Sequence, residues 1–353
     1  MEVRKVWHLL AAASLLSVMA GCGTAASTGG SSGTTLANST IRVGFSLPTM
    51  QGSIYEAFED YMVKAAQDYT QKTGRKIDFI FTVAHDSAAT QASQVQDLIA
   101  QHPNVLILMP VDNESILASI QAAQRAGIPV MTYNRNAAPS KTIHAPFVGL
   151  NTYQEAYIAT KAFASILKKD HIKPVCVDVE GALDDQVALS RIAGYNAAAA
   201  KYGIHTLESI PTNWEPSEAE SGLEAALTAH PNINCVFVAS DFLMPGVEAA
   251  LKAVGRWAPS GQPHHMMLAS QDGFPLGIQL LKANYENVQA GYNIMGMSQA
   301  AIQMVVRLAD HKPLPSQNVL VPPVLLYPST VNSTPNLWGV NPTAGVAAGT
   351  TNG

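Results

Sequence analysis

The strongest constraint on the fold is a regular alternation of short apolar runs with segments of helical periodicity, beginning at residue 41. Runs such as "IRVGFSL", "KIDFIFTV", "NVLILMP" and "IPVMTY" are almost continuously apolar, which is typical of strands buried on both faces. Between them, apolar residues recur at helical spacing, for example at Phe58, Met62, Ala66 and Tyr69. This alternation predicts an α/β fold in which helices cover both faces of a parallel sheet.

The same rhythm restarts after residue 150 and predicts a second lobe of the same kind. "FVGL" at 147–150 ends the first half, and "PVCVDV", "INCVFVA" and "HMMLAS" are expected strands of the second. With 353 residues, 47% of them hydrophobic, the chain is long enough to bury two cores. We therefore predict two doubly wound, Rossmann-like lobes.

Residues 1–40 do not follow this pattern and indicate export. Arg4 and Lys5 precede an apolar stretch too short to span a bilayer comfortably, an arrangement typical of a signal peptide over 1–21. "VMAGC" resembles a bacterial lipobox and predicts lipidation of Cys22, with ordinary cleavage after "TAA" as the alternative. Residues 22–40, rich in Gly, Ser and Thr, predict a flexible tether. The expected location is the extracytoplasmic side of a membrane, on a lipid anchor.

Charge and motif content argue against nucleic-acid binding and against catalysis. The net charge is −5, and Lys and Arg form no cluster of the nucleic-acid type. No strand leads into a G-x-S-x-G elbow or a G-x-G-x-x-G loop, and we find no matched acid–base pair. We therefore predict that the chain is not an enzyme and needs no cofactor. We also predict no metal site, because the adjacent His264 and His265 would point to opposite faces of a strand.

Cys176 and Cys235 are the two cysteines that follow the predicted leader. Both lie in apolar runs, where a buried cysteine usually behaves as a small hydrophobic residue. Export would permit a disulfide between them. We nevertheless expect two free, buried thiols.

Polar residues stand at the carboxyl ends of several predicted strands. "IPVMTY" is followed by Asn134 and Arg135, "VFVA" by Ser240, and "MLASQ" by Asp272. In open α/β sheets, ligands bind beyond these strand ends, where the strand order reverses. We expect the polar groups of both lobes to face a common cleft.

Three segments follow one another in the chain: "MPVDNESILASIQAAQRAGIPVMTYNR", "AHPNINCVFVASD" and "QDG". In this order they resemble segments of the type I periplasmic sugar-binding proteins, the ribose-binding-protein group among the substrate-binding proteins of ABC transporters. The resemblance covers roughly residues 41–327 and implies two lobes joined by a multi-strand hinge. The implied boundaries are 41–150 with 294–318 for the N-terminal lobe, 151–293 with 319–327 for the C-terminal lobe, and 328–353 for a loose tail.

The resemblance also implies a ligand site to which both lobes contribute. Its expected members are Gln51, Ile54, Tyr55, Asn134, Arg135, Trp214, Ser240, Asp272 and Asn293. The five donors of Arg135 suit a ring oxygen and a neighbouring hydroxyl, whereas Asp272 either accepts from hydroxyls or caps a helix. Trp214 and Tyr55 either stack on a sugar or belong to the core. The family also has a second ligand-binding arginine, on the first helix of the second lobe. This chain has no arginine in the corresponding region, residues 187–189.

Together these expectations describe an exported, lipid-anchored monomer that captures a sugar or polyol and delivers it to an ABC permease. Arg135 with Asp272 would leave the site near neutral, which favours a neutral polyhydroxylated ligand over a sugar acid. The alternative is a subunit that presents a small molecule to a membrane receptor or histidine kinase. Sugar-responsive repressors share the two-lobe architecture and carry an N-terminal helix-turn-helix. The predicted export signal occupies that place in this chain, which argues against a repressor.

Overall fold

The computed structural model describes residues 39–334 and 337–339. The predicted signal peptide, Cys22 and almost all of the predicted tether lie outside the described residues, so the predictions for them stay predictions. Within the described residues, no helix has both the length and the apolar character needed to cross a membrane.

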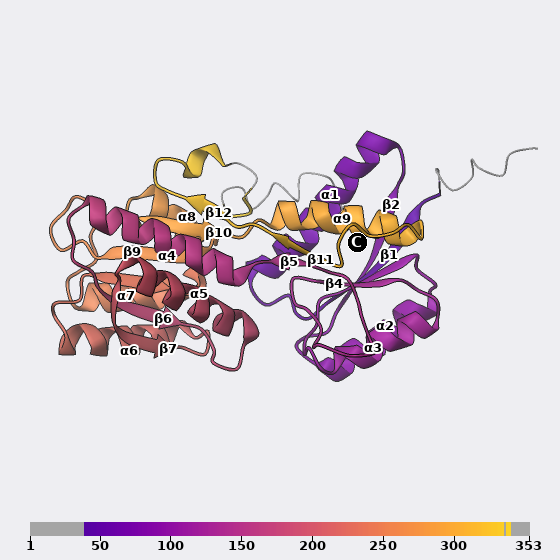
Figure 1. Cartoon of the computed structure of the whole chain (residues 1–353), viewed down its shortest axis with the longest axis horizontal. Coiled ribbons are helices and arrows are strands. Elements are labelled where there is room, and N and C mark those ends of the chain that lie inside the picture. The colour runs from indigo at the N-terminus through magenta and orange to yellow at the C-terminus, as the bar shows by residue number, and fades with distance from the viewer. Residues whose placement is uncertain (1–38, 335–336, 340–353) are drawn as a thin grey trace, which may run out of the picture. The chain divides into compact units, whose positions relative to one another are not determined.

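In the described part of the chain, the first sheet has six parallel strands in the order β11-β5-β4-β3-β1-β2 (Figure 1). They are β1 (Ile41–Leu47), β2 (Ile77–Val83), β3 (Val105–Leu108), β4 (Val130–Tyr133), β5 (Phe147–Leu150) and β11 (Asn318–Val321). One face packs against α1 (Ser53–Thr73) and α9 (Ile294–Ala309), and the other against α2 (Ala88–Ala100) and α3 (Ile116–Arg125). Val105 and Ile107 join the first core, whereas Leu106 and Leu108 join the second, because side chains alternate along a strand.

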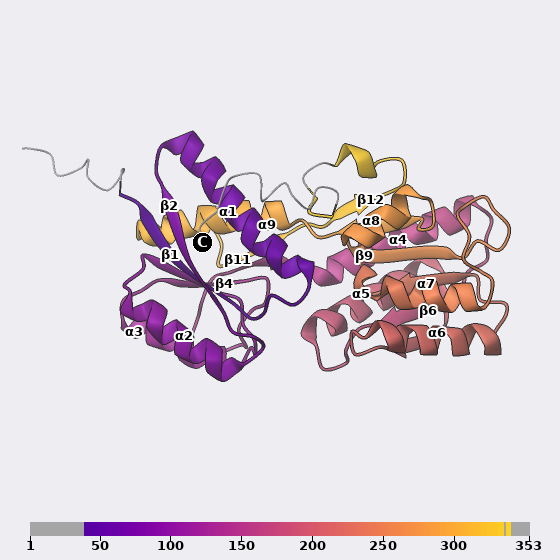
Figure 2. The ribbon, with the colours of Figure 1, turned by 180° about the vertical axis from the view of Figure 1, so that it is seen from behind.

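The second sheet, again among the described residues, has the order β12-β10-β9-β8-β6-β7, in which only β12 is antiparallel to its neighbour. Its strands are β6 (Val175–Glu180), β7 (His205–Pro211), β8 (Cys235–Val238), β9 (Met267–Asp272), β10 (Val288–Gly291) and β12 (Val324–Leu326). One face packs against α4 (Thr152–Lys169) and α5 (Gln186–Tyr202), the other against α6 (Pro216–Ala229) and α7 (Met244–Ala253), as Figure 2 shows from behind. The predicted α/β class with two doubly wound lobes is confirmed.

The chain crosses between the two sheets at three places in the described residues: after β5, after β10 and after β11. The predicted boundary at the last crossing needs correction. The resemblance places residues 319–327 in the C-terminal lobe, but 318–321 form β11 in the first sheet and 324–326 form β12 in the second. Pro322 and Pro323 separate them, and proline interrupts a strand because it has no N–H to donate to the sheet.

Part of the segment expected to be a loose tail is packed instead. Val331 and Trp338 are 0% and 2% exposed, and Leu337 is buried as well. Val331 and Leu337 share a small core with α8 (Pro275–Lys282), the helix that follows β9. The prediction of a loose tail is therefore wrong for Val331 and for residues 337–339. Val331 and Leu337 pack against α8, and Trp338 joins the core that contains Tyr292 and Ile294.

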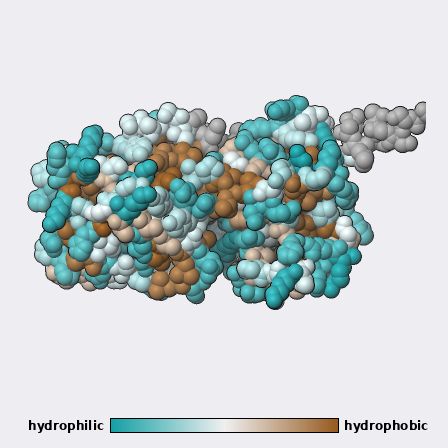
Figure 3. Space-filling view, in the orientation of Figure 1, coloured by the Kyte–Doolittle hydropathy of each residue, from teal (hydrophilic) through white to brown (hydrophobic). Residues whose placement is uncertain are grey.

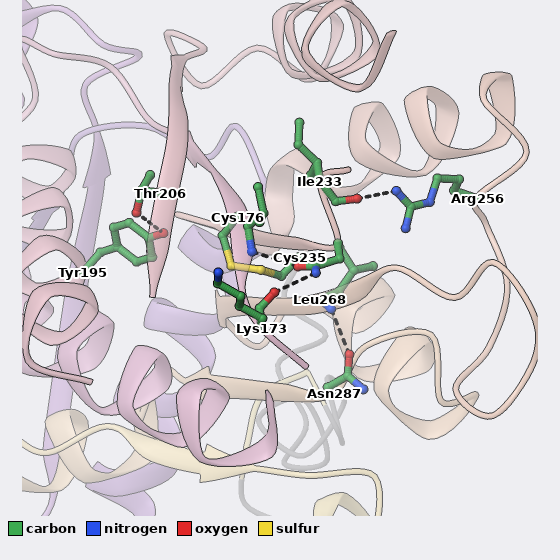
Figure 4. The surroundings of a disulfide bond; sticks show 11 residues. Lys173, Cys176, Tyr195, Thr206, Ile233, Cys235, Arg256, Leu268 and Asn287 are labelled. Carbon is green, nitrogen blue, oxygen red and sulfur yellow. Dashed lines mark hydrogen bonds between the residues drawn. A yellow bond between two sulfur atoms is a disulfide. The ribbon is translucent and has the colours of Figure 1, made fainter. Parts of the chain in front are cut away.

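Cys176 and Cys235 form a disulfide, so the expectation of two free thiols is also wrong (Figure 4). The two residues are direct partners in the pairing of β6 with β8, and their Cα atoms lie 4.4 Å apart. A Cα separation of this size permits a disulfide. The two strands are neighbours although β7 lies between them in the sequence, so the sheet order brings the cysteines together.

We predict that the free energy of unfolding decreases between pH 6 and pH 8, in part because of Glu286. Burial raises the pKa of Glu286 to about 8, although the hydrogen bond from Ser270 lowers it. An unfolded Glu titrates near ~4.3, so between these values the folded state holds a proton that the unfolded state lacks. Stability then falls as pH rises, by up to ~1.4 kcal/mol per pH unit from this one group.

Urea unfolding at pH 6, 7 and 8 measures this slope. Glu286→Gln should flatten the slope by roughly the contribution of one proton. Glu224→Gln, which alters an exposed residue of α6, should leave it unchanged. Equal slopes for the Glu286 variant and the unaltered protein would contradict the prediction.

Candidate functional site

A cavity of about 260 Å³ lies beyond the carboxyl ends of strands from both sheets. From the first lobe, its lining consists of Gln51, Gly52, Ile54, Tyr55, Phe58, Asn134 and Arg135. From the second lobe and the crossing after β10, its lining consists of Asp185, Val187, Arg191, Trp214, Ser240, Phe242, Asp272, Phe274 and Tyr292. A second pocket of about 560 Å³ adjoins it and shares Asn134, Arg135, Asp185 and Val187.

The strand ends present their side chains to this cavity through unusual backbone conformations. Asn134, Trp214 and Asp272 have φ of +59°, +62° and +87°. Residues other than glycine seldom adopt positive φ, and the strain persists only where the surrounding structure holds it. Three such residues around one cavity are typical of a functional site.

Arg135 reaches the cavity from the end of β4 and is held by Tyr55. Its Nη2 donates to the Tyr55 hydroxyl over 2.9 Å, and its guanidinium carbon lies 6.0 Å from the centre of the tyrosine ring. Within the described residues, Arg135 forms no ion pair with a carboxylate. Several of its N–H donors are thus available to a ligand.

Asn134 is fixed by a bond that joins the first lobe to the crossing after β10. The Tyr292 hydroxyl donates to the Asn134 side-chain oxygen over 2.9 Å. Tyr292 is 4% exposed and packs edge-on against Phe58, with ring centres 6.0 Å apart. Among the described residues, the amide nitrogen of Asn134 has only a long contact of 3.9 Å, to the sulfur of Met109, so it can donate to a ligand.

Arg191 on α5 holds the second lobe's side of the cavity. It is 3% exposed and donates to both carboxylate oxygens of Asp272, to Glu155 Oε2 over 2.9 Å and to the Ala239 carbonyl over 2.8 Å. Burial lowers the pKa of Arg191, but Asp272 and Glu155 raise it more, so it is raised overall. The arginine therefore remains charged, as a buried cation surrounded by partners can.

The two carboxylates that share Arg191 cannot both be balanced by its single charge. Burial raises the pKa of Glu155, and Asp272 raises it further, whereas Arg191 lowers it; the net direction is upward. Ser240 donates a further hydrogen bond to Asp272. Asp272 is therefore already engaged by Arg191 and Ser240, and its position relative to a ligand is rigidly set.

Trp214 is anchored by Asp185. Its indole N–H donates to Asp185 Oδ2 over 2.9 Å, while Asp185 Oδ1 accepts from the N–H of Val187 and so caps α5. The ring lies so close to Gly181 that a Cβ there would come 2.2 Å from it. The anchored ring offers an aromatic face of the kind that stacks on sugar C–H groups.

Aromatic side chains cover much of the remaining lining. Phe242 is 42% exposed and lies next to Phe274, with ring centres 5.8 Å apart. On the face drawn in Figure 3, hydrophilic residues cover most of the surface and hydrophobic residues gather in separate patches. An exposed aromatic ring beside polar strand ends suits a ligand with both apolar C–H and polar O–H groups.

Eight of the nine predicted site residues line the cavity: Gln51, Ile54, Tyr55, Asn134, Arg135, Trp214, Ser240 and Asp272. Asn293 does not; its side chain caps α9 by accepting from the N–H of Gly296 over 3.0 Å. The preceding residue, Tyr292, takes the place in the lining. The family resemblance led to this crossing, but not to the residue of the adjacent pair that lines the cavity.

Sequence reasoning missed the other eight lining residues: Gly52, Phe58, Asp185, Val187, Arg191, Phe242, Phe274 and Tyr292. Residues 187–189 have no arginine, yet Arg191 lies two positions further along the same helix and reaches the cavity. Phe274 could have been found, because it follows the predicted strand-end pair Asp272 and Gly273. Within the described residues, no group of three or more His, Cys, Asp or Glu side chains is placed to bind a metal ion.

Comparison with known sequences identifies the relatives. The model of the family described as a periplasmic binding protein domain matches residues 43–313. The ribose import binding protein of Salmonella typhimurium is 24% identical over 218 residues, which are 61% of this chain and 70% of that protein. The xylitol-binding protein of Mycolicibacterium smegmatis is 28% identical over 256 residues, 71% of this chain and 67% of that protein.

Solved structures show the same fold. An ABC transporter periplasmic solute binding protein from Actinobacillus succinogenes, with bound D-allose, has a TM-score of 0.71 at 21% identity, over 83% of this chain and 99% of that chain. A periplasmic ribose ABC transporter structure from Conexibacter woesei has a TM-score of 0.73 at 18% identity, over 85% of this chain and 95% of that chain. At these identities the likeness concerns the fold alone.

Proposed function

We propose that this chain, since it belongs to the periplasmic binding protein domain family, captures a sugar or polyol in the cavity between its two sheets. The observation that carries the proposal is the arrangement of two sets of side chains around one cavity. Arg135 and Asn134 extend from the first lobe, and Trp214, Ser240 and Asp272 from the second. A ligand that contacts both sets stabilises the closed arrangement of the lobes, because its binding energy favours the state in which both contacts form.

The charges of the lining favour a neutral ligand. The charged residues of the lining are Arg135, Arg191, Asp185 and Asp272, two of each sign. Arg191 and Asp272 neutralise each other directly. An acidic ligand would add a charge to a balanced, partly buried site, which is costly without a further partner. Relatives named for ribose and xylitol agree with a neutral polyhydroxylated class.

The proposal extends to the cellular setting. As a lipoprotein anchored through Cys22, the protein would hold its cavity close to the membrane at the end of the tether, on the extracytoplasmic side. Delivery to an ABC permease fits the names of the relatives, which are import binding proteins. The role consists of binding without chemical conversion, and we propose a monomer.

Isothermal titration calorimetry with pentoses, hexoses, polyols and the corresponding sugar acids tests the ligand class. We expect a neutral member of the panel to bind with a 1:1 stoichiometry and to raise the melting temperature, because a ligand of the folded state stabilises it by mass action. Tighter binding of a sugar acid than of its neutral parent would overturn the neutral-ligand proposal. Absence of binding across the panel would overturn the function.

Arg135→Met should weaken binding of that ligand by about 10- to 150-fold. The estimate follows from the ~1.5–3 kcal/mol contributed by a hydrogen bond to a charged group. The free energy of unfolding should change little, since Arg135 is half-buried and the substitution removes one side-chain hydrogen bond, the one to Tyr55. Arg125→Met, on the exposed side of α3, is the matched control. Equal affinities of the two variants would remove Arg135 from the site.

A further inference from the structure

The C-terminal residues 337–339 lie directly behind the turn that carries two lining residues, Asp272 and Phe274. The indole N–H of Trp338 donates to the carbonyl oxygen of Asp272 over 3.2 Å. The Trp338 ring meets the Phe274 ring edge-on, with centres 4.8 Å apart. Trp338 itself is not part of the cavity lining.

The residues on either side of Trp338 hold it in this place. A Cβ on Gly339 would come 1.7 Å from the carbonyl oxygen of Gly273, so only a glycine permits this approach. Leu337 packs in one core with Ile278 and Leu281 of α8. These neighbours keep the indole in contact with the turn, on the side of the turn away from the cavity lining.

The turn needs such support because its backbone is strained. Asp272 and Gly273 both have positive φ, +87° and +83°, and such strain in a residue with a side chain persists only where neighbours hold it. Two contacts of its backbone fix the turn: the Tyr292 N–H donates to the Asp272 carbonyl over 2.8 Å, and the Phe274 N–H donates to Asp241 over 2.7 Å. Arg191 and Ser240 hold the side chain of Asp272. Trp338 adds a further backbone contact, and a ring contact to Phe274, from a segment outside both sheets.

We propose that Trp338 is a positioning residue for the ligand site. It acts through the turn, keeping the carboxylate of Asp272 and the ring of Phe274 in the geometry that receives the ligand. The inference rests on the proposed function, because it names a determinant of affinity for the same cavity. Residues 337–339 therefore serve binding although they touch no ligand.

The test compares three full-length variants. Trp338→Leu removes the ring and its N–H, Trp338→Phe keeps a ring without the donor, and Trp257→Leu removes a tryptophan that stacks on Tyr285 elsewhere in the second lobe. Hydrogen exchange followed by mass spectrometry reports on peptides covering 270–278. We expect exchange there to become at least ~10-fold faster in Trp338→Leu, less so in Trp338→Phe, and to stay unchanged in the control.

Calorimetry on the same variants measures the consequence for binding. The dissociation constant of the best ligand of the panel should rise about fivefold or more in Trp338→Leu and stay unchanged in Trp257→Leu. Unchanged exchange at 270–278, or faster exchange with unchanged affinity, would overturn the proposal. If the unaltered protein binds no member of the panel, the proposed function fails, and the exchange rates still decide whether Trp338 holds the turn.

Discussion

Replacing Arg191 by methionine should reduce the free energy of unfolding by about 3–5 kcal/mol, the usual cost of breaking a buried ion pair by removing one partner. The cause is the fate of the two carboxylates: Glu155 is 0% and Asp272 4% exposed, and both would be left buried without their cation. Urea denaturation at pH 7 measures the loss.

A triple variant separates the electrostatic cause from a loss of packing. Arg191→Met combined with Glu155→Gln and Asp272→Asn removes all three charges, and it should recover most of the lost stability. Ligand binding should not recover, because Asp272 lines the cavity and its carboxylate is absent in this variant. Arg307→Met, at an exposed arginine of α9, is the control and should be close to neutral. A triple variant as unstable as the single one would contradict the electrostatic explanation.

Breaking the disulfide between Cys176 and Cys235 should cost a similar amount, about 4 kcal/mol. The cysteines are 59 residues apart, and the chain-entropy relation for a loop of that length gives this value. The double variant Cys176→Ala with Cys235→Ala should therefore unfold at lower urea concentration than the oxidised protein. Ligand affinity should change little, because the bond lies inside the core beneath α4 and α5, and neither cysteine lines the cavity.

Reduction provides the matched control for this second prediction. Dithiothreitol should lower the stability of the unaltered protein and leave that of the double variant unchanged. Alkylation followed by mass spectrometry should find Cys176 and Cys235 unmodified until the protein is reduced. Full alkylation of both residues in the unreduced, denatured protein would show that the bond is absent.

The elements of the fold and much of the site could be read from local sequence. A strand buried on both faces needs an uninterrupted apolar run, and these runs placed β1, β3, β4, β8 and β9 with little ambiguity. The ends of parallel strands then lie at one edge of each sheet, so Asn134, Arg135, Ser240 and Asp272 could be placed in a common cleft. Both inferences depend on residues that are neighbours in the sequence.

What only the tertiary structure decided involves partners far apart in the chain. Arg191 is 81 residues from Asp272 and 36 from Glu155, and within its own helix it looks like any helical arginine. The disulfide depends on the order of β6 and β8 in the sheet, and Trp338 lies in a segment whose composition suggests a tail. In each case the deciding factor is a partner that only the folded chain brings close. For Arg191 and Trp338 that partner also removes the side chain from water, which a local sequence pattern does not encode.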